Sequence, residues 1–150
     1  MSENARLAKE ALARARTGSL ATLEPQSGAP YVSLVNFACD EKGLPIFLFS
    51  KLARHTKCLL VDPRASLLIA EVPTTGDALT GFRATFIGRM SEQPDKALTH
   101  LYCQRHPEAA GYVDFGDFSF WRLAPESIHV VGGFGRIETL PAAVVFRGTV

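Results

Sequence analysis

One short segment concentrates the side chains of this chain that could bind a ligand. Residues 50 to 57 carry two hydroxyls, three cations and one imidazole, and they follow the apolar run 45 to 49 directly. Hydroxyls and cations of this kind hold anions through charge-assisted hydrogen bonds. A helix that begins near Thr56 would add unpaired amide donors and a partial positive charge. The segment therefore predicts a phosphate pocket, and a solvated basic turn is the alternative at even odds on these residues alone.

The spacing of apolar residues predicts the elements that position this segment. A helix is expected over residues 4 to 16, a second from Thr56 to Val61 and a third between Pro94 and Pro107. Six strands are expected, over residues 19–23, 30–38, 45–49, 65–72, 82–90 and 117–131. The continuous apolar character of the fourth strand indicates burial on both faces, whereas the fifth alternates polar and apolar side chains.

Six strands joined by turns favour a mainly β fold. We expect an antiparallel barrel with helices covering its ends rather than a doubly wound parallel sheet. The chain has 150 residues with 47% hydrophobic composition, no internal repeat and no linker, which predicts one domain over residues 1–150.

Charge and composition exclude several classes of partner. Sixteen Lys and Arg against fifteen Asp and Glu leave no net field for nucleic acid or an acidic membrane surface. The first residues lack a signal-peptide pattern and no apolar run approaches a membrane span, so a cytoplasmic protein is expected. Cys39, Cys58 and Cys103 are widely spaced, which fits reduced thiols better than a disulfide framework or a metal site.

Three stretches of the chain resemble a known family. They are residues 20–23 with 28–33, residues 50–57 with 62–68, and residues 131–136. Their order and spacing over roughly residues 5 to 138 are similar to the FMN-binding split-barrel superfamily, the pyridoxamine 5'-phosphate oxidase-like proteins, and most closely to its heme-utilisation branch. The resemblance implies a six-stranded antiparallel split β-barrel with flanking helices. It also implies a homodimer with FMN held between the subunits.

The same resemblance implies roles for particular residues. The phosphate of FMN would be held by Ser50, Lys51, Arg54, Thr56 and Lys57, and the ring and ribityl chain would be lined by Ser33, Leu34, Val35 and Asn36. His55 would lie beside the flavin or the phosphate, with a capping or core role as the alternative. Arg83 would reach the pyrimidine edge or the phosphate, with a surface salt bridge as the alternative.

The glycine-rich segment 132–136 is predicted to be a turn that needs positive φ. Its glycine spacing does not match a dinucleotide-binding loop, and no helix pattern follows it. The resemblance places this loop near the ligand at the dimer interface, where Phe134 or Arg136 could close over the ring or an anionic group.

Three functions are compatible with these residues. The leading prediction is an FMN-binding flavoprotein, an oxidoreductase of unknown substrate. The alternative is a heme-binding or heme-utilisation protein that holds porphyrin propionates on the same cations, with His55 or His129 as axial ligand. The third is a dimeric scaffold without catalysis.

Two departures from the family narrow the range of activities. True pyridoxamine-phosphate oxidases carry an Arg and His arrangement near the carboxyl end that residues 136–140 lack, which disfavours vitamin B6 oxidation. Heme-utilisation relatives often carry a heme-ligating His in additional carboxy-terminal sequence, and no histidine follows His129 here, which argues against heme degradation.

Overall fold

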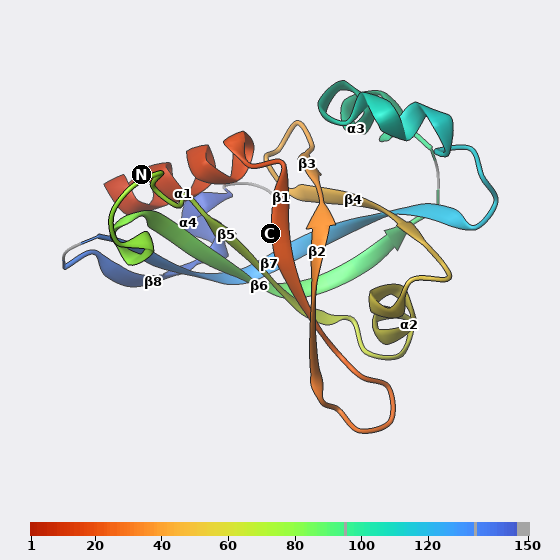
Figure 1. Ribbon diagram of the computed structural model, residues 1–150, viewed down its shortest axis with the longest axis horizontal. Helices are drawn as coiled ribbons and strands as arrows, with labels where there is room; N and C mark the ends of the chain where they lie inside the picture. The colour runs from red at the N-terminus through yellow and green to blue at the C-terminus, as the bar shows by residue number, and fades with distance from the viewer. Residues whose placement is uncertain (95, 134, 147–150) are drawn as a thin grey trace.

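A single curled antiparallel sheet of eight strands dominates the structure (Figure 1). The computed structural model describes residues 1–94, 96–133 and 135–146. The strands are β1 (Thr17–Leu23), β2 (Pro30–Asn36), β3 (Ala38–Cys39), β4 (Pro45–Ser50), β5 (Arg64–Ala70), β6 (Phe82–Gln93), β7 (Phe118–Gly132) and β8 (Ile137–Pro141). Their order across the sheet is β2-β1-β5-β6-β7-β4-β3, and β8 pairs with the second half of β7.

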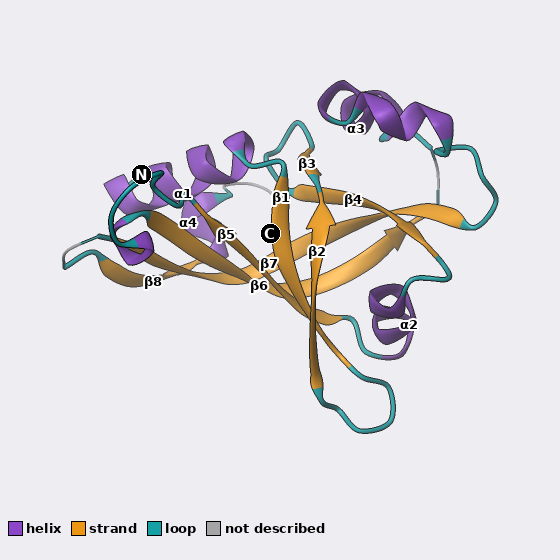
Figure 2. Ribbon diagram, in the orientation of Figure 1, coloured by secondary structure: helices purple, strands orange, loops and turns teal. Residues whose placement is uncertain are grey.

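Short helices sit around this sheet (Figure 2). They are α1 (Glu3–Arg14), α2 (Arg54–Val61), α3 (Thr99–Arg105) and α4 (Ala142–Val145), with 3₁₀ turns η1 (Ala78–Thr80) and η2 (Pro107–Gly111). Among the described residues, no helix combines the length and apolarity needed to cross a membrane.

The predicted antiparallel, mainly β fold is confirmed, with eight strands in place of six. The expected strand over 30–38 breaks at the buried Phe37 into β2 and the short β3. The second additional strand, β8, was missed because four of its five residues are exposed and give no alternating pattern. Pairing with β7 defines β8, and that pairing is a tertiary feature.

The main core lies inside the curl of the sheet. Leu20, Leu67, Phe86 and Ile128 stand opposite one another on four successive strands, and each is fully buried. The apolar stripe of α1 closes one side of this core, as the helical spacing of residues 4 to 16 predicts. A second, smaller cluster packs α3 and η2 against β4 and β7.

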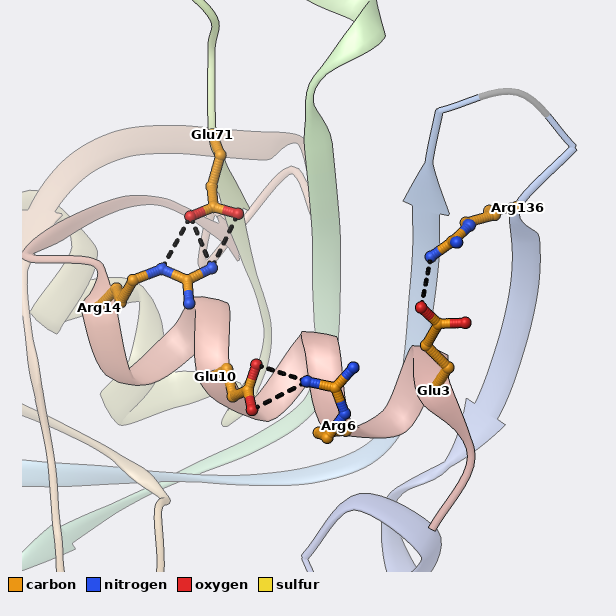
Figure 3. A network of polar contacts seen from close by, with 6 residues as sticks. All are labelled: Glu3, Arg6, Glu10, Arg14, Glu71 and Arg136. Carbon is orange, nitrogen blue, oxygen red and sulfur yellow. Dashed lines mark hydrogen bonds and ion pairs between the residues drawn. The ribbon is translucent and has the colours of Figure 1, made fainter.

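Ion pairs fasten the exposed side of α1 to other parts of the chain (Figure 3). Arg14 makes a forked contact with Glu71 at 2.8 Å, and Arg136 reaches Glu3 at 3.3 Å. Exposed pairs of this kind contribute about 0–1 kcal/mol each. Their structural consequence is that Arg136 is engaged by α1.

The sheet has a second face that stays open, which we call the outer face. The sequence predicted burial of β5 on both faces, and this is wrong: Ala65, Leu67 and Ile69 are buried, but Leu68 is 39% exposed. Leu34 on the edge strand β2, which β1 separates from β5, is 77% exposed. Apolar side chains therefore occupy both faces of these strands, while the core covers only one.

Candidate functional site

The segment that follows β4 is organised by its first hydroxyl. Ser50 Oγ accepts a hydrogen bond from the Leu52 amide at 3.1 Å and donates one to Asp117 Oδ2 at 3.0 Å. These contacts end the strand and turn the chain into α2, which begins at Arg54, slightly before the predicted start. The helix has no side-chain cap, so its first amides keep the donor capacity that the sequence predicted.

The three cations of the segment are in different states. Arg54 forms an ion pair with Glu24, and its guanidinium carbon lies 4.8 Å from the centre of the Tyr31 ring. Lys51 and Lys57 are exposed and have no ion pair within the described part of the chain. The strongest anion-binding side chain of the segment is thus already occupied by a carboxylate from the β1–β2 hairpin.

Four of the predicted ligand-lining residues meet at one cavity of about 320 Å³ between β2, β4, α2 and the start of β7. We call it the aromatic cavity. Its walls are Leu34, Val35, Asn36, Leu48, Phe49, His55, Tyr102, Tyr112 and Phe118. Leu34 and Asn36 point to the outer side of β2, whereas Ser33 and Val35 alternate to the inner side. The structure thus brings the predicted β2 segment and His55 together.

His55 is wedged into the wall of this cavity. Its ring centre lies 4.1 Å from that of Phe49, and its Nε2 atom is buried with no hydrogen-bond partner. Burial lowers the pKa of His55 below its usual 6.5, so the imidazole is neutral at pH 7. The Oγ1 atom of Thr56 is likewise buried and unpartnered, so this hydroxyl faces the interior instead of solvent.

The cavity walls carry no charge at neutral pH. Burial raises the pKa of Tyr102 and of Tyr112, which keeps both phenols protonated. Together with the neutral His55, these phenols line a small uncharged space, and the cations of segment 50–57 are not among its walls.

Arg83 lies far from the predicted phosphate ligands around Ser50. Ser50 stands opposite Phe118 at the start of β7, and Arg83 stands opposite Val131 near its end. Thirteen residues of strand separate these positions, a path of about 43 Å. The Nη1 atom of Arg83 donates to the carbonyl of Leu79 at 2.7 Å.

The glycine-rich turn lies at the same distant end of the molecule (Figure 1). Gly133 and Gly135 have φ of +83° and +74°, which confirms the predicted need for positive φ. Arg136 pairs with Glu3, and Phe134 lies outside the described residues. Within one chain the turn lies at one end of the long axis, and α2 lies in the other half (Figure 1).

The outer face holds a feature that sequence reasoning did not assemble. Residues opposite one another on neighbouring antiparallel strands share a face. One such row runs across six strands through Leu34, Ser19, Leu68, Thr85, His129 and Thr139. His129 is half-buried in this row, and its Nδ1 lies 2.9 Å from Thr139 Oγ1. The alternation of β6 was the available signal, but the row needs the register of every strand.

A sheet curled around one core, open on its outer face and capped by short helices, defines a split β-barrel protein. A family model described as "CREG, beta-barrel" matches residues 1–144, so the chain belongs to this family.

Two curated relatives match most of the chain. It is 44% identical over 120 residues to the chloroplastic heme oxygenase HOZ of Arabidopsis thaliana, which covers 77% of this chain and 36% of HOZ. It is 31% identical over 135 residues to heme oxygenase HutZ of Vibrio cholerae, which covers 85% of this chain and 76% of HutZ. The chain thus spans little more than a third of the length of HOZ.

Similar solved structures also carry names that refer to heme. A heme binding protein from Mycobacterium smegmatis superposes with a TM-score of 0.87 at 29% identity, over 97% of this chain and 60% of that one. HutZ, described there as a heme storage protein, superposes with a TM-score of 0.71 at 25% identity, over 88% of this chain and 97% of that one. The predicted resemblance to the heme-utilisation branch is confirmed.

The leading functional prediction, an FMN-binding flavoprotein with oxidoreductase activity, is wrong. The relatives just described are named for heme, and FMN as the primary cofactor has no support from them. The physical reason for the error is that hydroxyls and cations fit any anion. In addition, Arg54 and Ser50 already have carboxylate partners in Glu24 and Asp117.

Proposed function

We propose that this protein binds heme. The observation that carries the proposal is that the chain presents two imidazoles, His55 and His129, each beside apolar side chains and each with Nε2 free of hydrogen bonds among the described residues. The heme-named relatives support the same conclusion. Bound heme would supply its own iron redox chemistry, while the chain would supply ligation, an apolar seat and charge.

The chain also offers partners for the anionic propionates. Lys51 and Lys57 are exposed cations, and Arg83 has guanidinium N–H groups left over after its backbone contacts. Arg54 joins them only when it leaves Glu24. We propose that the cations of one of these two regions bind propionates, in place of the FMN phosphate that the sequence predicted. The hydroxyls of Ser50 and Thr56 are engaged or buried and serve the local structure.

We further propose that the heme-binding form is a homodimer. The outer face exposes Val32 and Leu34 on β2, Leu68 on β5 and Ile87 on β6. A second copy of this chain that faces this surface, with the ligand held between the two copies, would remove these side chains from water. Light scattering should give twice the chain mass, and an Ile87→Arg variant should shift the equilibrium toward the monomer. A monomeric wild-type protein at micromolar concentration would contradict the dimer.

Titration of the purified protein with ferric heme, followed by visible absorption, tests the proposal. Saturable binding with a nitrogen-ligand spectrum is the expected result. Iron-free protoporphyrin is the matched control, because it keeps the ring and propionates but cannot be ligated, and it should bind more weakly. Absence of saturable heme binding would sink the proposed function and favour the dimeric scaffold without cofactor.

A further inference from the structure

We propose that heme is seated on the outer face of the sheet, with its iron bound to Nε2 of His129 and one propionate paired with Arg83. The inference rests on the proposed function, since it names the seat and the ligand of the heme-binding activity. It selects one of the two histidines, His55 and His129, that the sequence offered as the iron ligand. Four observations carry it: the orientation of His129, the floor around it, the nearby cation, and the closure of the competing site.

Thr139 fixes the orientation of the His129 ring. The Nδ1 atom of His129 and the Oγ1 atom of Thr139 are 2.9 Å apart across the β7–β8 pair. When Nδ1 carries the proton and donates it to this hydroxyl, Nε2 keeps its lone pair. Histidines that bind metals commonly hold their other ring nitrogen in such a hydrogen bond. Thr139 is therefore a positioning residue for an iron ligand.

The residues around His129 form a floor for a planar ring, which we call the His129 platform. It comprises the outer-face residues of β5 to β8 in the row of His129 and the two adjoining rows. They are Ser66, Leu68, Ala70, Arg83, Thr85, Ile87, Ser127, His129, Val131, Ile137, Thr139 and Pro141. Four strands and five residue positions give it sides of about 14 and 13 Å, the scale of a porphyrin.

The composition of the platform suits an apolar ring. Most of its side chains are small or aliphatic, and Leu68, Ile87 and Ile137 are 39%, 39% and 68% exposed. Small hydroxyl and methyl groups such as those of Ser127 and Ala70 keep the surface low around the imidazole. Contact with a porphyrin would remove the exposed aliphatic groups from water, which favours binding in proportion to the area covered.

Arg83 supplies charge at the edge of the platform. It stands two residues from Thr85 on β6, and Thr85 is directly opposite His129, which makes Arg83 a diagonal neighbour about 7–8 Å away. Its Nη1 donates to the carbonyls of Leu79 and Gly81, and its other N–H groups have no partner among the described residues. Among the platform residues, all of them described, Arg83 and His129 are the only ionisable side chains, so no carboxylate opposes a propionate there.

The competing imidazole is closed off. Nε2 of His55 has no exposure to solvent and lies in a ring contact with Phe49. The aromatic cavity of about 320 Å³ is at the low end of roughly 300–1,000 Å³ for ligand pockets. Iron could reach His55 only after the ring left its packed position.

Heme titrations of His129→Ala and His55→Ala, with His100→Ala as the control for an exposed histidine, test the inference. His129→Ala should lose the nitrogen-ligand absorption and electron paramagnetic resonance spectrum and raise the Kd at least tenfold, and free imidazole should restore the spectrum. Thr139→Val keeps the ligand but should raise the Kd by about tenfold, because outer hydrogen bonds to metal ligands have effects of this size. Circular dichroism of each variant confirms that it is folded.

The outcomes separate this inference from the proposed function. If wild-type protein binds heme and His129→Ala gives the same spectrum and Kd, the seat is wrong while heme binding stands. Loss of the spectrum in His55→Ala with retention in His129→Ala would also overturn it. Failure of wild-type protein to bind heme would instead overturn the function on which the inference rests. Should His129→Ala misfold, His129→Gln with the same imidazole rescue decides the question.

Discussion

The aromatic cavity and the His129 platform carry one imidazole each, and they differ in almost every other respect. The cavity is small and lined mainly by packed rings, with its imidazole nitrogen buried. The platform is open and low, and its imidazole is half-buried on the outer face with Nδ1 beside Thr139 Oγ1. The residue types that suggest an anion site in the sequence thus lie in a region where Arg54 and Ser50 already have carboxylate partners.

The origin of the two regions explains this difference. The residues of segment 50–57 are adjacent in the chain, so they attract attention in sequence, but their partners Glu24 and Asp117 come from distant segments. The platform residues are scattered from residue 66 to residue 141, and only strand register gathers them. Proximity in sequence and availability for a ligand are therefore independent properties here.

The largest expected difference between the two regions is in how far a substitution lowers the free energy of unfolding. Phe49 is 4% exposed and packs against Phe47 and His55, so Phe49→Ala should lower the free energy of unfolding by about 3–5 kcal/mol. Ile87→Ala on the platform should cost well under half as much, because the side chain is already partly in water. Urea unfolding of each variant measures both free energies, at protein concentrations over which the unfolding midpoint does not change. Equal costs would mean that the platform is as tightly packed as the cavity.

The next contrast concerns heme affinity. Ser127 lies two residues before His129 on the same face of β7, where a large side chain would stand above the platform. Ser127→Trp should raise the heme Kd at least tenfold, equal to about 1.4 kcal/mol, with little loss of stability. Leu60→Trp, at an exposed position of α2, is the matched control. If both variants bind heme like wild type, the platform is not the seat.

The sequence predicted much of the local structure. Helical spacing located α1 to within two residues at each end, alternation located β6, and the glycines located the positive-φ turn. The burial of β5 was mispredicted because an apolar run reads the same whether a strand has one or two covered faces.

The cofactor was harder to predict for a related reason. Cations and hydroxyls in a sequence indicate that an anion could bind, but they do not identify the anion. They also do not show that a carboxylate from a distant segment, such as Glu24, pairs with one of these cations in the folded chain. His129 was visible as a candidate, but its partner Thr139 belongs to β8, the strand that the sequence did not show. The wrong cofactor prediction and the missed role of Thr139 thus both come from contacts between residues far apart in the sequence.

His55 provides a smaller test, which concerns the buried state of its ring nitrogen. A buried ring nitrogen without a partner costs free energy, and phenylalanine keeps the shape of the ring without that atom. His55→Phe should therefore raise the free energy of unfolding at pH 7 by about 1 kcal/mol. The measurement is urea unfolding, with His100→Phe as the exposed control. A clear loss of stability would show that the His55 nitrogen has a favourable partner.

The same histidine predicts a pH dependence. Burial lowers the pKa of His55 in the folded protein below 6.5, so below pH 6.5 the unfolded chain binds a proton that the folded protein resists. The wild type should then lose stability as the pH falls from 6.5 toward the folded pKa, and show no such dependence above 6.5. Because the other histidines are common to both proteins, the advantage of His55→Phe should grow as the pH is lowered from 7.5 to 5.5. A constant difference across this range would contradict the burial of the imidazole.

The smallest expected effect concerns the ion pair between Glu24 and Arg54. Glu24 is mostly buried while Arg54 is mostly exposed, and a pair with one exposed partner is worth about 0–1 kcal/mol, so Glu24→Gln should cost at most about that much. The Glu24→Gln variant frees the guanidinium of Arg54, near Lys57 and Lys51. If these cations bind the propionates, the affinity of the variant for heme should rise several-fold. If the heme lies on the His129 platform, the affinity should match that of Glu24→Asp, which keeps the charge. A rise in Glu24→Gln alone, lost on adding Arg54→Gln, would move the seat from the platform to the cations of segment 50–57, beside the aromatic cavity, and reverse the contrast between the two regions.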